Sequence, residues 1–163
     1  MVSKERGNIM KSAIDDTIAY IKHMAQDMVG FDPKYAVLAF MFDLKIPVKH
    51  YGFEHLKSAI LMRYENPTMD LVNEIYWAIA ETHGDASGEV VAASIRRVIR
   101  SSFDRDNITK WKIYLPASKL TEEHPPTNAE VIAGLARIVE FWQGCSEAYL
   151  RQAKKEVVSC GRK

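Results

Sequence analysis

Cysteine is scarce in this sequence, and its scarcity excludes one large class of small proteins. Only Cys145 and Cys160 occur among 163 residues, and both lie toward the C-terminal end. A small secreted domain that is held together by disulfide bonds needs a much higher density of cysteine. We therefore expect a protein of the reducing cytoplasm, in which the two thiols are buried or idle.

Long apolar runs are missing as well. The most continuous one, from Ala36 to Phe42, is far shorter than the roughly 20 residues that a helix needs to cross a bilayer. The first residues, around Lys4 and Arg6, lack the apolar stretch of a secretory signal peptide. We expect neither a membrane-spanning segment nor export, and no membrane partner.

Neither sign of charge dominates, because 22 Lys and Arg residues stand against 21 Asp and Glu residues. The overall charge is therefore neutral on the question of a nucleic-acid partner, and a DNA-binding face has to come from local clustering. The hydrophobic share of 47% and the charged share of 26% are typical of a globular protein with one good core. We expect one domain with extensions.

Motifs that would indicate catalysis are absent from the sequence. It contains no phosphate-binding glycine loop, no pair of histidines at metal-ligand spacing and no nucleophile motif. His50 and His55 diverge around a helix, which favours ordinary surface or core roles. The acidic pair Asp15 and Asp16 would need a parallel sheet around it to accept a phosphoryl group. We expect no enzyme, no metal and no cofactor.

Apolar residues recur at three- and four-residue spacing in six segments, which is the pattern of helices that each bury one face. The predicted helices cover approximately residues 8–28, 35–44, 52–64, 71–83, 87–103 and 128 to beyond 149. Thr127 and Glu130 form a capping box before the last helix. The segment 104–124 is expected to be extended or irregular. No convincing strand occurs, and the predicted fold class is all-α.

The first predicted helix carries a wide apolar stripe, which includes Ile14, Ile18, Ile21 and Ala25. This stripe needs a partner surface. It either folds back on the extended final helix of its own chain or pairs with a second copy, and symmetric pairing is common for a helical face of this kind. The sequence therefore predicts a homodimer through the terminal helices as one of two arrangements.

The fourth helix, the tight connection at His83-Gly84-Asp85 and the fifth helix look like a helix-turn-helix unit, with Asp85 or Ser87 as the cap of the fifth helix. In such units the second helix enters the major groove of DNA. This orientation predicts base contacts near Glu89, Ala92 and Ala93, and phosphate contacts from the arginines Arg96, Arg97 and Arg100. The alternative is that these arginines form only a solvated face.

Three blocks of residues give this unit a family context. They are Ile46-Pro47 with Gly52-Phe53, Leu56 and Ala59-Ile60; then Ile95-Arg96, Ile99, Phe103, Arg105 and Asn107-Ile108; and finally Pro126-Thr127-Asn128, Glu130 and Ile132-Ala133. In order and spacing, the chain from about residue 32 to 142 resembles the C-terminal effector domain of stage-zero sporulation protein A. The resemblance implies a DNA-binding transcription regulator with a helix-turn-helix. It leaves residues 1–31 as a helical extension and 143–163 as an extension of the last helix with a basic tail.

The resemblance also has departures. The family opens its recognition helix with Ser-Arg-Val-Glu-Arg, where this chain has the five residues from Glu89 to Ala93. Val90 and Ala93 cannot make the bidentate hydrogen bonds by which arginine reads guanine, and Ala92 cannot accept from cytosine. The residues that we still expect at DNA are Ser87, Glu89, Ala92, Ala93, Arg96, Arg97, Arg100 and Arg105.

Two functions follow as hypotheses. The first is a regulator that binds double-stranded DNA with altered or relaxed base specificity. The second is a protein-interaction module that keeps the fold and binds another regulator protein without touching DNA. The first thirty residues stand where the family has its receiver domain, so we expect either an input other than receiver phosphorylation or no input at all.

Overall fold

The computed structural model describes residues 2–160, with the side chains of residues 7–157, and within this range it is all-α. The helices are α1 (Val2–Asp27), α2 (Pro33–Asp43), α3 (Gly52–Glu65), the π-helical turn η1 (Leu71–Ile75), α4 (Tyr76–His83), α5 (Gly88–Ser102), α6 (Ile108–Tyr114) and α7 (Asn128–Cys160). No β-strand occurs in the described range, where Thr121 and His124 make only an isolated bridge. The predicted fold class is confirmed.

Local signals account for several helix ends. The Asp32 side chain accepts a hydrogen bond from the Lys34 amide and starts α2. The Thr127 hydroxyl accepts from the Glu130 amide while the Glu130 carboxylate accepts from the Thr127 amide, which confirms the predicted capping box at α7. Gly84, at a φ of 73°, ends α4 in the left-handed conformation that glycine adopts without strain.

The expectation of an irregular segment from 104 to 124 is wrong for residues 108–114, because α6 forms there. Seven residues are too few for a clear periodic pattern, so this helix has no strong signal of its own. Tertiary packing stabilises it: Trp111 and Tyr114 are buried in the core. The Asn107 side-chain amide, just before α6, donates hydrogen bonds to the carbonyl oxygens of Leu44 and Ser102.

Helix α3 lies at the centre of the domain, in contact with α2, α5 and α7. Its first residue must be small, because a Cβ atom on Gly52 would lie 2.2 Å from the carbonyl oxygen of Ser94 in α5. Because the two backbones approach this closely, the inner side of α5 packs directly on α3. Phe40, Phe53 and Trp142 are among the large side chains that fill the space between these helices.

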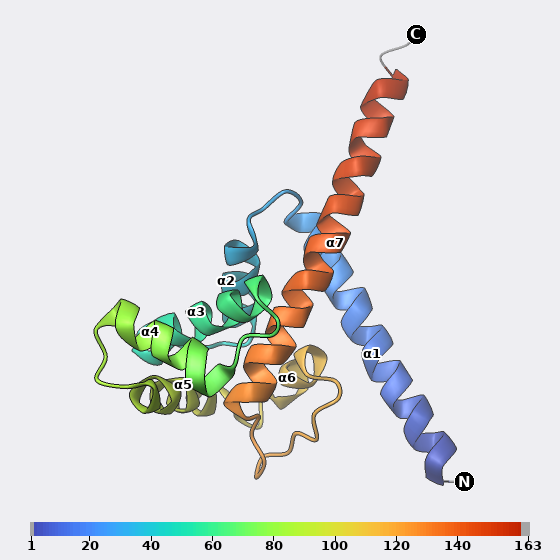
Figure 1. Ribbon diagram of the computed structural model, residues 1–163. Coiled ribbons are helices and arrows are strands. Elements are labelled where there is room, and N and C mark those ends of the chain that lie inside the picture. The colour runs from blue at the N-terminus through green and yellow to red at the C-terminus, as the bar shows by residue number, and fades with distance from the viewer. Residues whose placement is uncertain (1, 161–163) are drawn as a thin grey trace.

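The terminal helices α1 and α7 cross each other, and the two chain ends point to opposite ends of the molecule (Figure 1). On α1, Ile21 and Ala25 are fully buried, Ile18 is partly buried and Ile14 is exposed. The C-terminal part of the stripe therefore packs within its own chain, where α1 contacts α6 and α7. The Thr17 hydroxyl adds a hydrogen bond of 2.6 Å to the carbonyl oxygen of Ile113.

Of the two cysteine side chains, the structure describes that of Cys145. Cys145 is a free, partly buried cysteine, and burial raises the pKa of its thiol, which disfavours the reactive thiolate. The side chains of Cys160 and of the basic tail residues Arg162 and Lys163 lie outside the described residues.

A polar cluster attaches α1 to the domain. The Asp43 carboxylate in α2 accepts hydrogen bonds of 2.6 Å from the Tyr20 hydroxyl of α1 and 2.7 Å from the Tyr114 hydroxyl of α6. The Lys110 ammonium group lies 3.2 Å from the same carboxylate. Burial alone would raise the pKa of Asp43, but the three donors together outweigh this effect and hold that pKa below its ordinary value.

We expect Asp43→Asn to lower the free energy of unfolding at pH 7 by about 2 kcal/mol, since the hydrogen bonds lose their charged acceptor. The folded-state pKa of Asp43 is depressed, so its contribution is fully present above the unfolded pKa of about 4 and is lost as the pH falls through the folded pKa. Urea unfolding of both proteins at pH 7 and pH 3 checks this, with Asp27→Asn on the exposed side of α1 as the matched control. A stability difference between the wild type and the Asp43→Asn variant that persists undiminished at pH 3 would contradict it.

Candidate nucleic-acid interface

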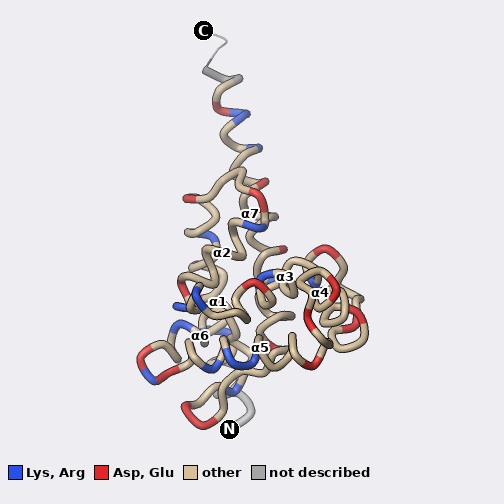
Figure 2. The backbone as a smooth tube through the Cα atoms, turned by 90° about the vertical axis from the view of Figure 1, so that its left-hand side faces the viewer, with Lys and Arg blue, Asp and Glu red and all other residues tan. Residues whose placement is uncertain are grey.

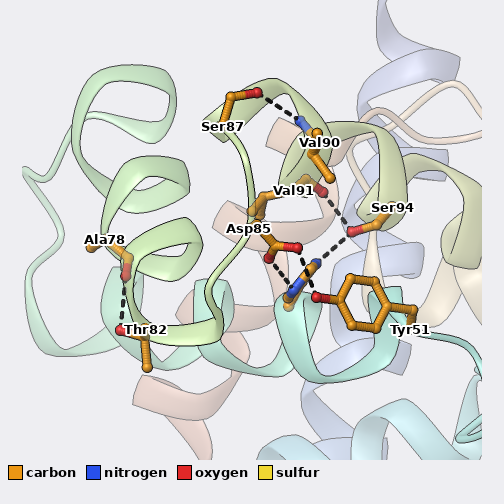
Figure 3. A network of polar contacts seen from close by, with 9 residues as sticks. Tyr51, Ala78, Thr82, Asp85, Ser87, Val90, Val91 and Ser94 are labelled. Atoms are coloured by element: carbon orange, nitrogen blue, oxygen red, sulfur yellow. Dashed lines mark hydrogen bonds and ion pairs between the residues drawn. The ribbon is translucent and has the colours of Figure 1, made fainter.

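The candidate interface begins at the connection between α4 and α5. Three residues, Asp85, Ala86 and Ser87, follow Gly84 before α5 starts. The Ser87 hydroxyl oxygen accepts from the Val90 amide at 3.4 Å, so Ser87 and not Asp85 is the cap of α5 (Figure 3). Gly88 lies directly against α4, because a Cβ atom there would be 3.3 Å from the Cβ of Tyr76. Helix α4, the short turn and helix α5 therefore form a compact unit.

Asp85 has a different role, which the sequence did not reveal. Its carboxylate accepts a 2.7 Å hydrogen bond from the Tyr51 hydroxyl and lies 2.9 Å from Nε2 of His55 (Figure 3). Nδ1 of His55 lies 2.6 Å from the Ser94 hydroxyl oxygen, and that hydroxyl is also within hydrogen-bond distance of the Val91 carbonyl oxygen. This network joins the turn before α5 to α3 on one side and to the inner side of α5 on the other.

His55 is fully buried at the centre of this network. Burial lowers the pKa of the imidazole, and the Asp85 carboxylate offsets part of that effect. The side chains of Ser94, His55 and Asp85 are almost completely shielded from solvent. They therefore position the turn and do not form an open nucleophilic site. His55 and Asp85 lie on different elements and far apart in the chain, so no local pattern could have paired them.

Helix α5 has the two faces that its sequence predicts. The expected inward set is buried: Val91, Ile95, Val98, Ile99 and Ser102. Of the expected outward set, Glu89, Ala93 and the three arginines are exposed, and Ala92 is partly buried. The structure thus places seven of the eight candidate residues, from Ser87 to Arg100, on or at the start of one helix. Arg105 lies beyond the end of this helix.

The N-terminal end of α5 already holds a negative charge. The pKa of the Glu89 carboxyl is lowered, first by a hydrogen bond from the Ser87 side chain and then by its own backbone amide. A carboxylate is stabilised at a helix N-terminus, where a phosphate would otherwise bind. Ser87 and Glu89 are therefore engaged with each other and with the helix start.

Arg96, Arg97 and Arg100 are exposed on α5, and no acidic group pairs with them among the residues that the structure describes. Figure 2 shows blue segments of the backbone beside the α5 label. Arg105 differs, because its guanidinium lies 3.4 Å from the carboxylate of Glu122. Three unpaired guanidinium groups on one exposed helix face can bind phosphate groups.

Metal-binding clusters and membrane-spanning helices are absent from the part of the chain that the structure describes. Nowhere in it do three His, Cys, Asp or Glu side chains gather closely enough to hold a metal ion. None of its helices has the combined length and apolar composition that crossing a bilayer requires.

Comparison with known proteins decides the family. The family described as Sporulation initiation factor Spo0A C terminal matches residues 37–139, which is more than half of the chain. The chain belongs to this family. The family consists of DNA-binding effector domains of sporulation initiation and is not a family of enzymes. No curated protein matches the chain. Helix α1 and the C-terminal part of α7 lie outside the matched residues.

Proposed function

We propose that the chain is a transcription regulator whose α4, turn and α5 act as a helix-turn-helix on double-stranded DNA, with phosphate contacts as the main source of affinity. The observation that carries this proposal is the set of three exposed arginines without acidic partners among the described residues of the chain. Phosphate contacts supply most of the affinity of sequence-independent DNA binding. The buried network around His55 supports the proposal, because it holds the turn before α5 in one position.

Base specificity in this proposal is altered or relaxed. Base edges are read by the N-terminal half of a recognition helix, and here this half exposes Val90 and Ala93, which carry no side-chain donor or acceptor. Ala92 and Ala93 can touch the methyl group of thymine, which discriminates far less than a bidentate hydrogen bond. Among the residues that we expect at DNA, Arg96 still matches an arginine of the family.

A salt titration of DNA binding tests the function. With three arginines at phosphates, the logarithm of the affinity should fall with the logarithm of the salt concentration with a slope of about 2.7 or more. Fluorescence anisotropy with a random duplex and with a promoter duplex measures both slopes and the preference between them. We expect similar slopes and a small preference. A lack of measurable binding at low salt would overturn the proposal.

The terminal helices are proposed to form a homodimer. Apolar side chains stay exposed where α1 and α7 extend beyond the domain: Ile9 is 70% and Val157 is 73% exposed, and Met10, Ile14 and Leu150 are also exposed. Apolar stripes on projecting helices are common interaction surfaces. Sedimentation should show a dimer at high micromolar concentration, and Ile9→Glu should shift it toward monomer. A wild-type protein that sediments as a monomer under these conditions would exclude the dimer.

The second candidate function is a protein-interaction module that binds another regulator protein. One observation favours it specifically: the face of α5 that should read bases presents Val90, which is 42% exposed, in place of a polar side chain. The salt titration separates the two candidates, since a module of this kind would show no duplex affinity at low salt.

A further inference from the structure

A groove with a cavity volume of about 410 Å³ runs beside the exposed face of α5. One wall comes from η1 and the start of α4, the other comes from α5, and the segment 125–129 that leads into α7 closes it. Pockets for small organic molecules in proteins have volumes of about 300–1,000 Å³. The groove is therefore large enough for one small ligand. Phosphate contacts from α5 would use only one of its walls and would give the opposite wall no role.

That opposite wall is apolar and open to solvent. Val72 is 62% exposed and Trp77 is 50% exposed, and both line the groove. Trp111 and Trp142, in contrast, are completely buried. Two exposed apolar side chains on one wall of the groove offer a surface on which an aromatic ring can pack.

The α5 wall is cationic. Arg96 and Arg100 line the groove, whereas Arg97 on the same helix does not. Burial raises the pKa of the Tyr76 hydroxyl, which also lines the groove, and the hydrogen bond with Asn128 and the positive charge of Arg96 offset part of that rise. Glu89 lines the groove too, so the two guanidinium groups outnumber the single carboxylate there.

A buried polar atom of the groove lining lacks a partner. The Asn128 side-chain amide donates hydrogen bonds to the Tyr76 hydroxyl and to the Ala92 carbonyl oxygen. Its carbonyl oxygen Oδ1 is buried and has no hydrogen-bond partner among the described residues. This oxygen is closed off from solvent and is not open to a ligand, so the role of Asn128 is to join the α4 wall of the groove to the α5 wall through the two hydrogen bonds that it donates.

We propose that this groove binds a small organic anion with a flat aromatic body. The aromatic body packs on Trp77 and Val72, and the anionic group lies between Arg96 and Arg100. Such a ligand would occupy two of the arginines that are proposed to contact phosphates, and it would therefore compete with DNA; this consequence rests on the proposed function. The ligand site itself does not depend on DNA binding.

Two matched dyes test the site without DNA. The probes are 1-anilinonaphthalene-8-sulfonate, which has an aromatic body, an N–H donor and a sulfonate, and N-phenyl-1-naphthylamine, which lacks only the sulfonate. Dye fluorescence gives the two dissociation constants. Heteronuclear NMR follows the indole N–H resonances, with Trp77 assigned through Trp77→Phe. We expect the sulfonate dye to shift the Trp77 resonance and to leave those of Trp111 and Trp142 in place.

Variants then separate the charge from the apolar surface. Arg96→Ala with Arg100→Ala should weaken binding of the sulfonate dye by about tenfold and leave the uncharged dye within about twofold. The control Arg97→Ala removes one charge from the same helix outside the groove and should change neither dye. Circular dichroism confirms that the variants are folded. An unshifted Trp77 resonance, or equal sulfonate-dye affinity in the double variant and wild type, would overturn the proposal.

Discussion

Replacing Arg96, Arg97 and Arg100 together by alanine is expected to weaken binding to duplex DNA by about 100-fold at low salt and to reduce the salt slope by about 2.7. The expected loss is large because each guanidinium is exposed on one helix face and has no acidic partner among the described residues. The loss should be similar for every DNA sequence, since phosphates carry no sequence information. Folding should survive, because none of the three side chains belongs to the buried face of α5.

A matched control removes the same charge elsewhere. Arg151, Lys154 and Lys155 are exposed residues near the end of α7. This end of α7 points away from α5 (Figure 1). Replacement of these three residues by alanine lowers the net charge equally and should change duplex affinity only slightly. If anisotropy shows unchanged affinity in the folded α5 variant, or an equal loss in the α7 variant, α5 is not the docking element.

The second expected result is a gain of base discrimination. Val90→Arg, Ala92→Glu and Ala93→Arg restore the polar groups with which the family reads its DNA site, and each good bidentate contact contributes about 1–3 kcal/mol of discrimination. In a competition assay at one stated salt concentration, the wild type should prefer the family's site over scrambled DNA only slightly. The triple variant should prefer it by at least about tenfold.

The structure shows that the three replacements are not equal. Val90 and Ala93 are exposed and can be lengthened into solvent, whereas Ala92 is partly buried, and its carbonyl oxygen accepts from Asn128. The double variant Val90→Arg with Ala93→Arg is therefore the safer comparison and should recover most of the gain. Strong wild-type preference for the family site would show that the alignment of α5 is shifted. No gain in either folded variant would show that α5 does not dock as the family's helix does.

Features that depend on neighbours within one or two helical turns could be predicted from the sequence. The inward face of α5 repeats every three or four residues, so Val91, Ile95 and Ile99 were assigned correctly. The capping box of Thr127 and Glu130 needs only a three-residue spacing. The family resemblance and the position of the three arginines on one face rest on the same local order.

The first helix shows the limit of local reasoning. Its apolar stripe required a partner surface but could not choose one, because packing within the chain and pairing with a second copy have the same periodicity. Ile21 and Ala25 pack within the chain, where α1 contacts α6 and α7, and the Asp43 cluster, with donors from α1 and α6, stabilises that arrangement. Ile9 and Ile14 remain exposed.

What the sequence alone determined was the all-α class, the starts of α3, α5 and α7 and the outward arginines of α5, because hydrogen bonds and side-chain periodicity within a helix involve residues about four positions apart. Only the tertiary structure decided the rest. Helix α6 forms because Trp111 and Tyr114 pack into the core. Asp85 holds the turn before α5 because it contacts His55 of α3. The groove exists because three segments of the chain meet. Each of these features depends on contacts between residues far apart in the chain, and packing creates such contacts only when the helices assemble.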